Sequence, residues 1–185
     1  MTALFIILGI IAFLAIFIIT IYNRLVALRQ TCNQAWSDVD VQLKQRYDLI
    51  PNLVNTVKGY AKHEKETFEE VVAARNSAVS ANGVGQQAKA EGMLGAALGK
   101  LFALAEAYPD LKANTNFLQL QDQLADVENK ISASRRFYNN AAQEYNTARE
   151  QFPAVIIASP LGFQGREFFE APEGDALMTA PEINF

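Results

Sequence analysis

The stretch FLQLQDQLADVENKISASRRFYNNAAQEYNTAREQF, residues 117–152, carries the most regular hydrophobic pattern in the 185-residue chain. Its apolar and small residues recur at alternating steps of three and four, as they do on one face of an amphipathic helix. They are Phe117, Leu120, Leu124, Val127, Ile131, Ser134, Tyr138, Ala141, Tyr145, Ala148 and Phe152. So narrow a stripe is typical of the seam between packed helices, and it predicts one long helix of a bundle.

Apolar residues also recur at helical spacings in three earlier segments, which are 24–47, 52–79 and 88–108. Pro51 separates the first two; because its ring clashes with the preceding turn, we expect the chain to bend or restart there. The stretch SANGVGQQ at 80–87 predicts a flexible turn. The sequence therefore predicts an all-α fold, with an antiparallel up-and-down four-helix bundle over residues 24–152. The alternative is three helices with an irregular excursion near Gly92, Gly95 and Gly99.

Residues 3–22, ALFIILGIIAFLAIFIITIY, hold no charged side chain. As a helix, about 20 residues span about 30 Å, the thickness of the hydrocarbon core of a bilayer. The basic start and small-x-small cleavage site of a signal peptide are missing, so residues 1–23 are expected to form an uncleaved transmembrane anchor. Arg24 and Arg29 follow this span and no basic residue precedes it. This asymmetry predicts a single-pass protein with its N-terminus outside and its bundle in the cytoplasm.

Residues 153–185 form a third region, in which four prolines and three glycines exclude a long helix. Short apolar pieces survive as AVIIA, GFQGREFF and the terminal EINF. Three interpretations stay open. The region could lie extended against the bundle, dock on another subunit by strand addition, or form a disordered tail.

Composition limits the chemistry that the chain can perform. A net charge of -4 excludes a generally basic protein that coats nucleic acid. The lone Cys32 lies on an apolar stripe with Trp36, which favours a buried structural thiol, and the lone His63 leaves little for a metal site or a catalytic triad. We therefore predict no catalytic, cofactor-binding or metal-binding residues. An enzyme using carboxylates and tyrosines stays open as the alternative.

Two long strings, AWSDVDVQLKQRYDLIPNLVNTVKGYAKHEKETFEEVVAARNSA at 35–78 and YPDLKANTNFLQLQDQLADVENKISASRRFYNNAAQEYN at 108–146, strongly resemble the LemA family of bacterial membrane proteins. The resemblance implies a single N-terminal helix in the bacterial cytoplasmic (inner) membrane and a cytoplasmic helical bundle. It implies no established catalytic residues. It also suggests a link with membrane-embedded zinc metalloproteases.

A set of polar residues surrounds the predicted break at Pro51 and falls within the family-like string. The set is Asp38, Asp40, Arg46, Tyr47, Asp48, Pro51 and Asn52. In the structural interpretation, Asp48 and Asn52 cap helix ends while Arg46 pairs with a carboxylate. In the functional one, this corner docks a membrane partner. The residues carried forward as a candidate partner interface are Arg46, Tyr47, Asp48, Pro51, Asn52, Phe168, Phe169 and Phe185.

The sequence is thus interpreted as a membrane-anchored helical scaffold or adaptor without catalytic activity. Residues 3–22 would contact the lipid bilayer, while the bundle and the C-terminal segment would hold or regulate another membrane protein. A zinc metalloprotease is the suggested partner class, and self-assembly into a homo-oligomer is a further expectation. Besides the enzyme, a second alternative is a membrane-shaping protein whose helical faces lie on lipid.

Overall fold

A computed structural model describes residues 2–170, and within this range the ordered elements are all helices. The all-α class and the long apolar N-terminal helix are confirmed. The helices are α1 (Thr2–Tyr60), α2 (Lys65–Ser80), α3 (Val84–Glu106), α4 (Pro109–Lys112), α5 (Thr115–Glu150) and α6 (Ala154–Ala158).

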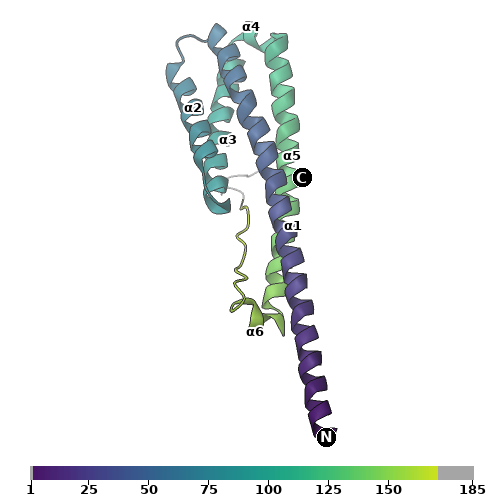
Figure 1. Cartoon of the computed structure of the whole chain (residues 1–185). Helices are drawn as coiled ribbons and strands as arrows, with labels where there is room; N and C mark the ends of the chain where they lie inside the picture. Colours follow the sequence, from purple (N-terminus) through teal and green to yellow (C-terminus); the bar gives the residue numbers. More distant parts are fainter. Residues whose placement is uncertain (1, 171–185) are drawn as a thin grey trace, which may run out of the picture.

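The helix α1 forms a continuous rod, and the other elements pack along the part of it farther from the N-terminus (Figure 1). Most of its tertiary contacts are with α5, whereas α2 packs chiefly against α3. Contacts occur in opposite order along α1 and α5. The Cys32 thiol donates to the carbonyl of Ala141, and at the far end Asn114 donates to the Tyr60 hydroxyl. The two longest helices, α1 and α5, are therefore paired over most of their shared length.

Pro51 lies inside α1, so the predicted helix break at this position is wrong. Proline has no N–H, and its ring crowds the carbonyl four residues earlier, which here belongs to Tyr47. That carbonyl accepts a hydrogen bond from Arg75 Nε of α2 at 2.8 Å instead. A donor from a neighbouring helix thus replaces the missing amide, and α1 continues to Tyr60.

The chain reverses after Gly59 and Tyr60, so the predicted segment 52–79 is divided between the end of α1 and α2. The next turn is shorter than predicted. Its residue Gly83 has φ +82°, a conformation that glycine adopts without steric cost. Beyond it α3 is continuous through its glycines, so the alternative of an irregular excursion there is also wrong.

The predicted stripe of α5 faces the core from Phe117 to Ala148. The stripe of α1 faces it as well, through Leu25, Cys32, Val39, Leu43 and Ile50. Phe152, by contrast, is 81% exposed, because α5 ends at Glu150 and the chain turns before reaching it. The period of three and four therefore locates the core correctly as long as the helix lasts.

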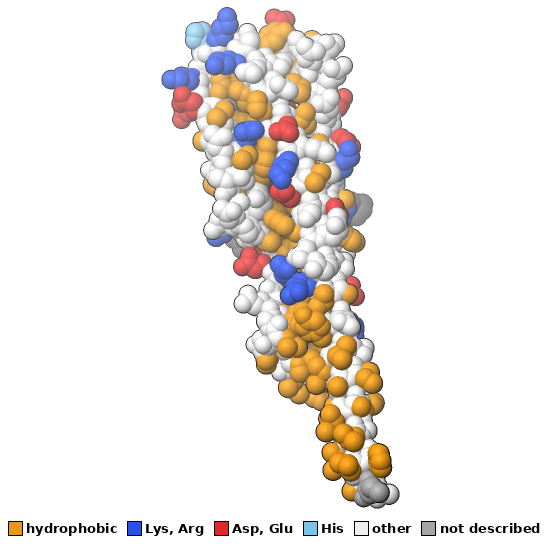
Figure 2. Space-filling view, in the orientation of Figure 1, with side chains coloured by type: hydrophobic (Ala, Val, Ile, Leu, Met, Phe, Trp, Pro, Cys, Tyr) orange, Lys and Arg blue, Asp and Glu red, His pale blue; other side chains and the backbone are white. Residues whose placement is uncertain are grey.

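The N-terminal part of α1 contacts little else in the molecule. It contains an 18-residue window of mean hydropathy 3.2, none of which is buried, so this helix is long and apolar enough to cross a membrane. Figure 2 shows hydrophobic side chains covering this lower end, while the charged side chains lie over the upper part. The apolar excess of the sequence is therefore concentrated at one end of the rod.

Candidate functional site

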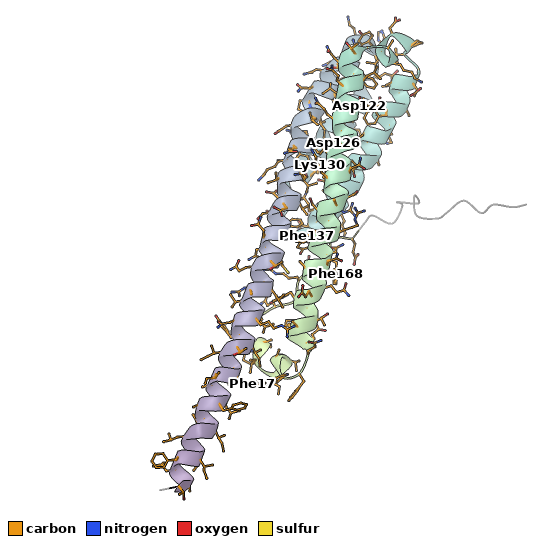
Figure 3. The ribbon with its side chains drawn as sticks, turned by 90° about the vertical axis from the view of Figure 1, so that its right-hand side faces the viewer. Phe17, Asp122, Asp126, Lys130, Phe137 and Phe168 are labelled. Carbon is orange, nitrogen blue, oxygen red and sulfur yellow. The ribbon has the colours of Figure 1, made fainter. Side chains whose placement is uncertain are left out.

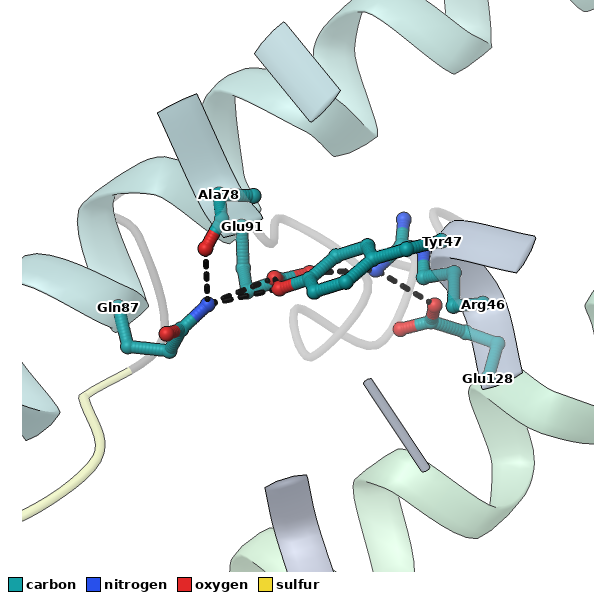
Figure 4. A network of polar contacts seen from close by, with 6 residues as sticks. All are labelled: Arg46, Tyr47, Ala78, Gln87, Glu91 and Glu128. Atoms are coloured by element: carbon teal, nitrogen blue, oxygen red, sulfur yellow. Dashed lines mark hydrogen bonds and ion pairs between the residues drawn. The ribbon is translucent and has the colours of Figure 1, made fainter. Parts of the chain in front are cut away.

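A buried polar cluster lies where α1, α3 and α5 meet, and Arg46 is its centre (Figure 4). Its guanidinium Nη1 lies 3.1 Å from Glu91 Oε2 of α3 and 3.1 Å from Glu128 Oε2 of α5. Arg46 and Glu91 are 8% and 7% exposed, whereas the Glu128 side chain is about half exposed. The predicted pairing of Arg46 with a carboxylate is confirmed, and the pairing ties three helices together.

Tyr47 extends the cluster toward α2. Its hydroxyl donates to Glu91 and accepts from Gln87 Nε2 at 2.7 Å. The same Gln87 nitrogen lies 3.2 Å from the carbonyl of Ala78 in α2. Burial raises the pKa of the Tyr47 hydroxyl, and the hydrogen bond and negative charge of Glu91 raise it further. Tyr47 therefore stays protonated near neutral pH, where it serves as a hydrogen-bond donor rather than as a base.

The other polar residues of the predicted corner do not join this cluster. Asp48, Pro51 and Asn52 are exposed on the surface of α1, and the capping role predicted for Asp48 and Asn52 is wrong because both lie within a continuous helix. The structure thus splits the predicted set. Arg46 and Tyr47 are buried between the helices, Asp38, Asp48, Pro51 and Asn52 are exposed, and Asp40 is half-buried.

Gln87 and Glu91 were missing from the predicted site, although the sequence holds a signal for them. With the core residues Leu94, Leu98 and Leu101 they continue one stripe at steps of four and three. Polar side chains at such positions need buried partners, because an unpaired buried charge is costly. Arg75 and Glu128 carry no comparable signal, since each is reached only through tertiary packing.

A second polar arrangement holds the extended segment that follows α6. Asn146 exchanges two hydrogen bonds with the backbone of Arg166, both 2.8 Å long. Asn139 does the same with Phe169, at 2.8 and 3.0 Å. Seven helical residues rise about 10.5 Å and three extended residues span about 10 Å, so the two asparagines match the repeat of the segment. Described through residue 170, the segment lies extended against α5, as one of the three interpretations predicted.

The aromatic residues of the candidate interface lie in this second arrangement. The Phe169 ring is buried with its centroid 6.0 Å from that of Trp36, and the Arg135 guanidinium lies 4.6 Å over it. Phe168 is 43% exposed and points outward (Figure 3). Phe185 lies outside the described residues. Trp36 and Arg46 are ten residues apart on α1, or about 15 Å, so the predicted residues belong to two separate sites.

Cys32 is a structural residue of the interface between α1 and α5, as predicted. It is 1% exposed and its thiol donates to the carbonyl of Ala141 at 3.1 Å. Burial raises the pKa of the thiol, which keeps it in the unreactive protonated form. Over residues 2–170, no three His, Cys, Asp or Glu side chains gather in a way that could hold a metal ion.

An open groove lies between α1 and α2, at the end of the rod opposite the apolar N-terminal segment. Its volume is about 620 Å³. Three lysines and Glu69 border an apolar floor, and the principal lining residues are Lys58, Lys62, Lys65, Glu69, Val54, Phe68 and Val72. Val72 is 44% exposed and is accessible to a partner, whereas Phe68 is buried and packs the floor against the rest of the protein. This groove was not predicted from the sequence.

Comparison with known proteins identifies relatives along most of the chain. The family model described as LemA family matches residues 35–185. Magnetosome protein MamQ of Magnetospirillum gryphiswaldense is 28% identical over 88% of this chain and 70% of its own length. Magnetosome protein MamQ 2 of Paramagnetospirillum magneticum is 26% identical over 96% of this chain and 75% of its own. Protein LemA of Metamycoplasma hominis is 28% identical, over 82% and 69%.

Proposed function

Because the chain belongs to the LemA family, as the resemblance indicated, we propose that it is a membrane-anchored adaptor without catalytic activity. In this proposal it holds or regulates another membrane protein. Neither the family description nor the names of the relatives denote an enzyme. The magnetosome proteins among the relatives also support a membrane-associated protein without catalytic activity.

The observation that carries the proposal is the continuity of α1 from the apolar span to the groove. Residues 23–60 add 38 residues of uninterrupted helix beyond the span, which corresponds to a rise of about 57 Å. A rod of this kind holds a binding surface at a fixed height above a bilayer. The proposal places residues 3–22 in the bacterial cytoplasmic membrane with the N-terminus outside. Arg24 and Arg29 support this orientation through the bias of basic residues toward the cytoplasm.

The proposal treats the cytoplasmic helices as an antiparallel four-helix bundle whose buried polar cluster fixes their register. The Arg46 guanidinium has two carboxylate partners, and the Tyr47 hydroxyl has both a donor and an acceptor. These contacts stabilise one arrangement of helices, and they occupy the Tyr47 hydroxyl and the Glu91 carboxylate, which are the buried groups of the cluster that could act as a nucleophile or a base. The cluster therefore supports a structural role inside the adaptor.

The groove is the surface that we assign to the partner. The groove has a net positive charge, because Lys58, Lys62 and Lys65 outnumber Glu69 along it. With its apolar floor it suits a segment that is acidic and partly apolar, because complementary charge favours encounter and apolar contact adds affinity. A membrane zinc metalloprotease is the first partner class to test. A second copy of this chain is the other, since self-assembly is part of the same proposal.

Charge reversal in the groove tests the proposal. The variant Lys58→Glu with Lys65→Glu changes two groove lysines, and Lys89→Glu with Lys130→Glu makes the same change elsewhere. All four side chains are exposed, and each pair includes one lysine that forms an i,i+4 ion pair on its own helix. Purified from membranes in mild detergent, wild type and control should retain the partner, whereas the groove variant should lose it. Equal retention by both variants would contradict the assignment of the groove.

The absence of catalysis is tested separately. We expect protein purified from its native membrane to hold neither metal nor nucleotide in stoichiometric amount. Elemental analysis and the absorbance of material released on denaturation measure both. A tightly bound metal or nucleotide would contradict the adaptor and favour the enzyme.

A further inference from the structure

The turn that ends α5 has an unusual distribution of side chains. From residue 151 to 165 it contains no charged residue. Within its short helix α6, the small Ala154 and Ala158 are buried, while Val155 and Ile156 are 48% and 61% exposed. A surface helix of a soluble domain normally buries its large apolar residues. Here the small residues face the protein, whereas two of the three large ones, Val155 and Ile156, face outward and Ile157 is half-buried.

Neighbouring residues enlarge this exposed apolar surface. Phe152, just before α6, is 81% exposed, and Leu161, just after it, is 46% exposed. Together with Val155 and Ile156 they form a patch that we call the α6 foot. Scattered exposed apolar residues are ordinary, but four within ten residues of an uncharged turn indicate a surface that contacts a membrane or another protein.

The α6 foot lies beside the point where the apolar span ends. The ring of Phe163, which follows the foot, contacts that of Tyr22 edge-on with centroids 5.4 Å apart. The Arg29 guanidinium lies 5.1 Å from the centre of the same Phe163 ring. Figure 1 shows α6 beside the lower part of α1, and Figure 3 shows α6 near the level of Phe17, which belongs to the span. The foot is thus level with the end of the span.

We propose that the α6 foot inserts into the phospholipid bilayer, in the leaflet on the side of the bundle, as a second contact beside the transmembrane helix. The foot continues the apolar surface of the span without an intervening charged residue, and Arg24 and Arg29 lie just above it on α1, where lipid phosphates would be. Lipid is therefore favoured over a protein partner. A single helix is free to tilt and rotate within a bilayer, whereas interfacial contacts fix both motions. The foot sets which face of the rod meets a neighbouring membrane protein.

A fluorescent probe on the foot tests this insertion in the full-length chain. The variant Ile156→Cys, in a Cys32→Ser background, is labelled with NBD and placed in nanodiscs of phosphatidylethanolamine and phosphatidylglycerol. Some of these lipids carry a nitroxide high on the acyl chain. Phe137→Cys is the matched control, because Phe137 is also exposed, at 53%, and lies near the middle of α5 (Figure 3). It is 19 residues from Ile156 along the chain.

We expect the probe at position 156 to emit at shorter wavelength than the probe at 137 and to lose most of its emission when the nitroxide lipid is present. The probe at 137 should show neither effect. Identical spectra and no quenching at 156 would overturn the proposal. A blue shift at 156 without quenching by lipid would overturn it as well, because that result assigns the foot to a protein contact such as a second copy. The emission of Trp36, which packs against the buried ring of Phe169, checks that each variant is folded.

Discussion

Arg75 replaces the amide that Pro51 lacks, and we therefore predict that substitutions at positions 51 and 75 are energetically coupled. We consider the variant Arg75→Met, which keeps the aliphatic stem and removes the donor to the Tyr47 carbonyl. A hydrogen bond from a charged donor contributes about 1.5 to 3 kcal/mol, and Arg75 is only partly buried. We therefore expect the free energy of unfolding to fall by about 1.5 kcal/mol, or roughly tenfold in the unfolding equilibrium constant.

The second background is Pro51→Ala, which restores an amide at position 51 for the carbonyl of Tyr47. Because that carbonyl then has its helical partner, Arg75→Met should cost less than about 0.5 kcal/mol there, and the two substitutions should couple by about 1 kcal/mol. The assay is denaturant unfolding of the detergent-solubilised chain, followed through the fluorescence of its one tryptophan, Trp36. Arg136→Met, on an exposed arginine of α5, is the control and should have little effect in either background.

An equal cost of Arg75→Met in both backgrounds would refute this reasoning. It would mean that Arg75 stabilises the protein through other contacts and that α1 tolerates Pro51 without a substitute donor. A cost that disappears in the Pro51→Ala background would support the account, and it would explain why a proline lies within a helix of 59 residues.

Three further predictions concern the buried cluster and the extended segment. Glu91→Gln should lower the free energy of unfolding by about 3 kcal/mol, because it breaks a buried ion pair. Asp40→Asn, which removes the half-exposed partner of Lys44, should cost under about 1 kcal/mol, and similarly small costs for both variants would contradict the buried role of Glu91. Asn146→Ala removes two hydrogen bonds and should expose the extended segment to faster hydrogen exchange and proteolysis, whereas the exposed Asn140→Ala should leave both rates unchanged. Because folding raises the pKa of Tyr47, the contribution of its hydroxyl to stability is complete below its unfolded pKa of about 10 and is lost as pH rises above that value. Tyr47→Phe should therefore flatten the alkaline fall in the free energy of unfolding, by up to about 1.4 kcal/mol per pH unit. An unchanged slope would contradict the role of Tyr47 as a buried hydrogen-bond donor.

The sequence predicted those features that depend on local pattern. The stripe from Phe117 to Ala148 faces the core because a regular helix returns to the same face every seven residues, and residues 3–22 hold no charged side chain. One of the two interpretations of the corner at Pro51 also predicted that Arg46 pairs with a carboxylate, although it named neither Glu91 nor Glu128. These inferences needed no knowledge of which helices meet.

The errors arose where a distant side chain overrides a local rule. At Pro51 the missing amide leaves the Tyr47 carbonyl without its helical donor, and that carbonyl accepts a hydrogen bond from Arg75, which lies 24 residues after Pro51 on another helix. The asparagine contacts to the extended segment, and the groove between α1 and α2, likewise depend on how elements pack. The spacing of residues along the chain does not predict such contacts.

The measurement that tests the proposed adaptor role most directly is the native mass of the full-length chain, released from its own membrane in mild detergent. The account predicts a complex with a second membrane protein at fixed stoichiometry, which the groove variant Lys58→Glu with Lys65→Glu dissociates. It allows additional copies of the chain within that complex. A strict monomer without any partner, found for the wild-type protein under conditions that keep it folded, would contradict the account.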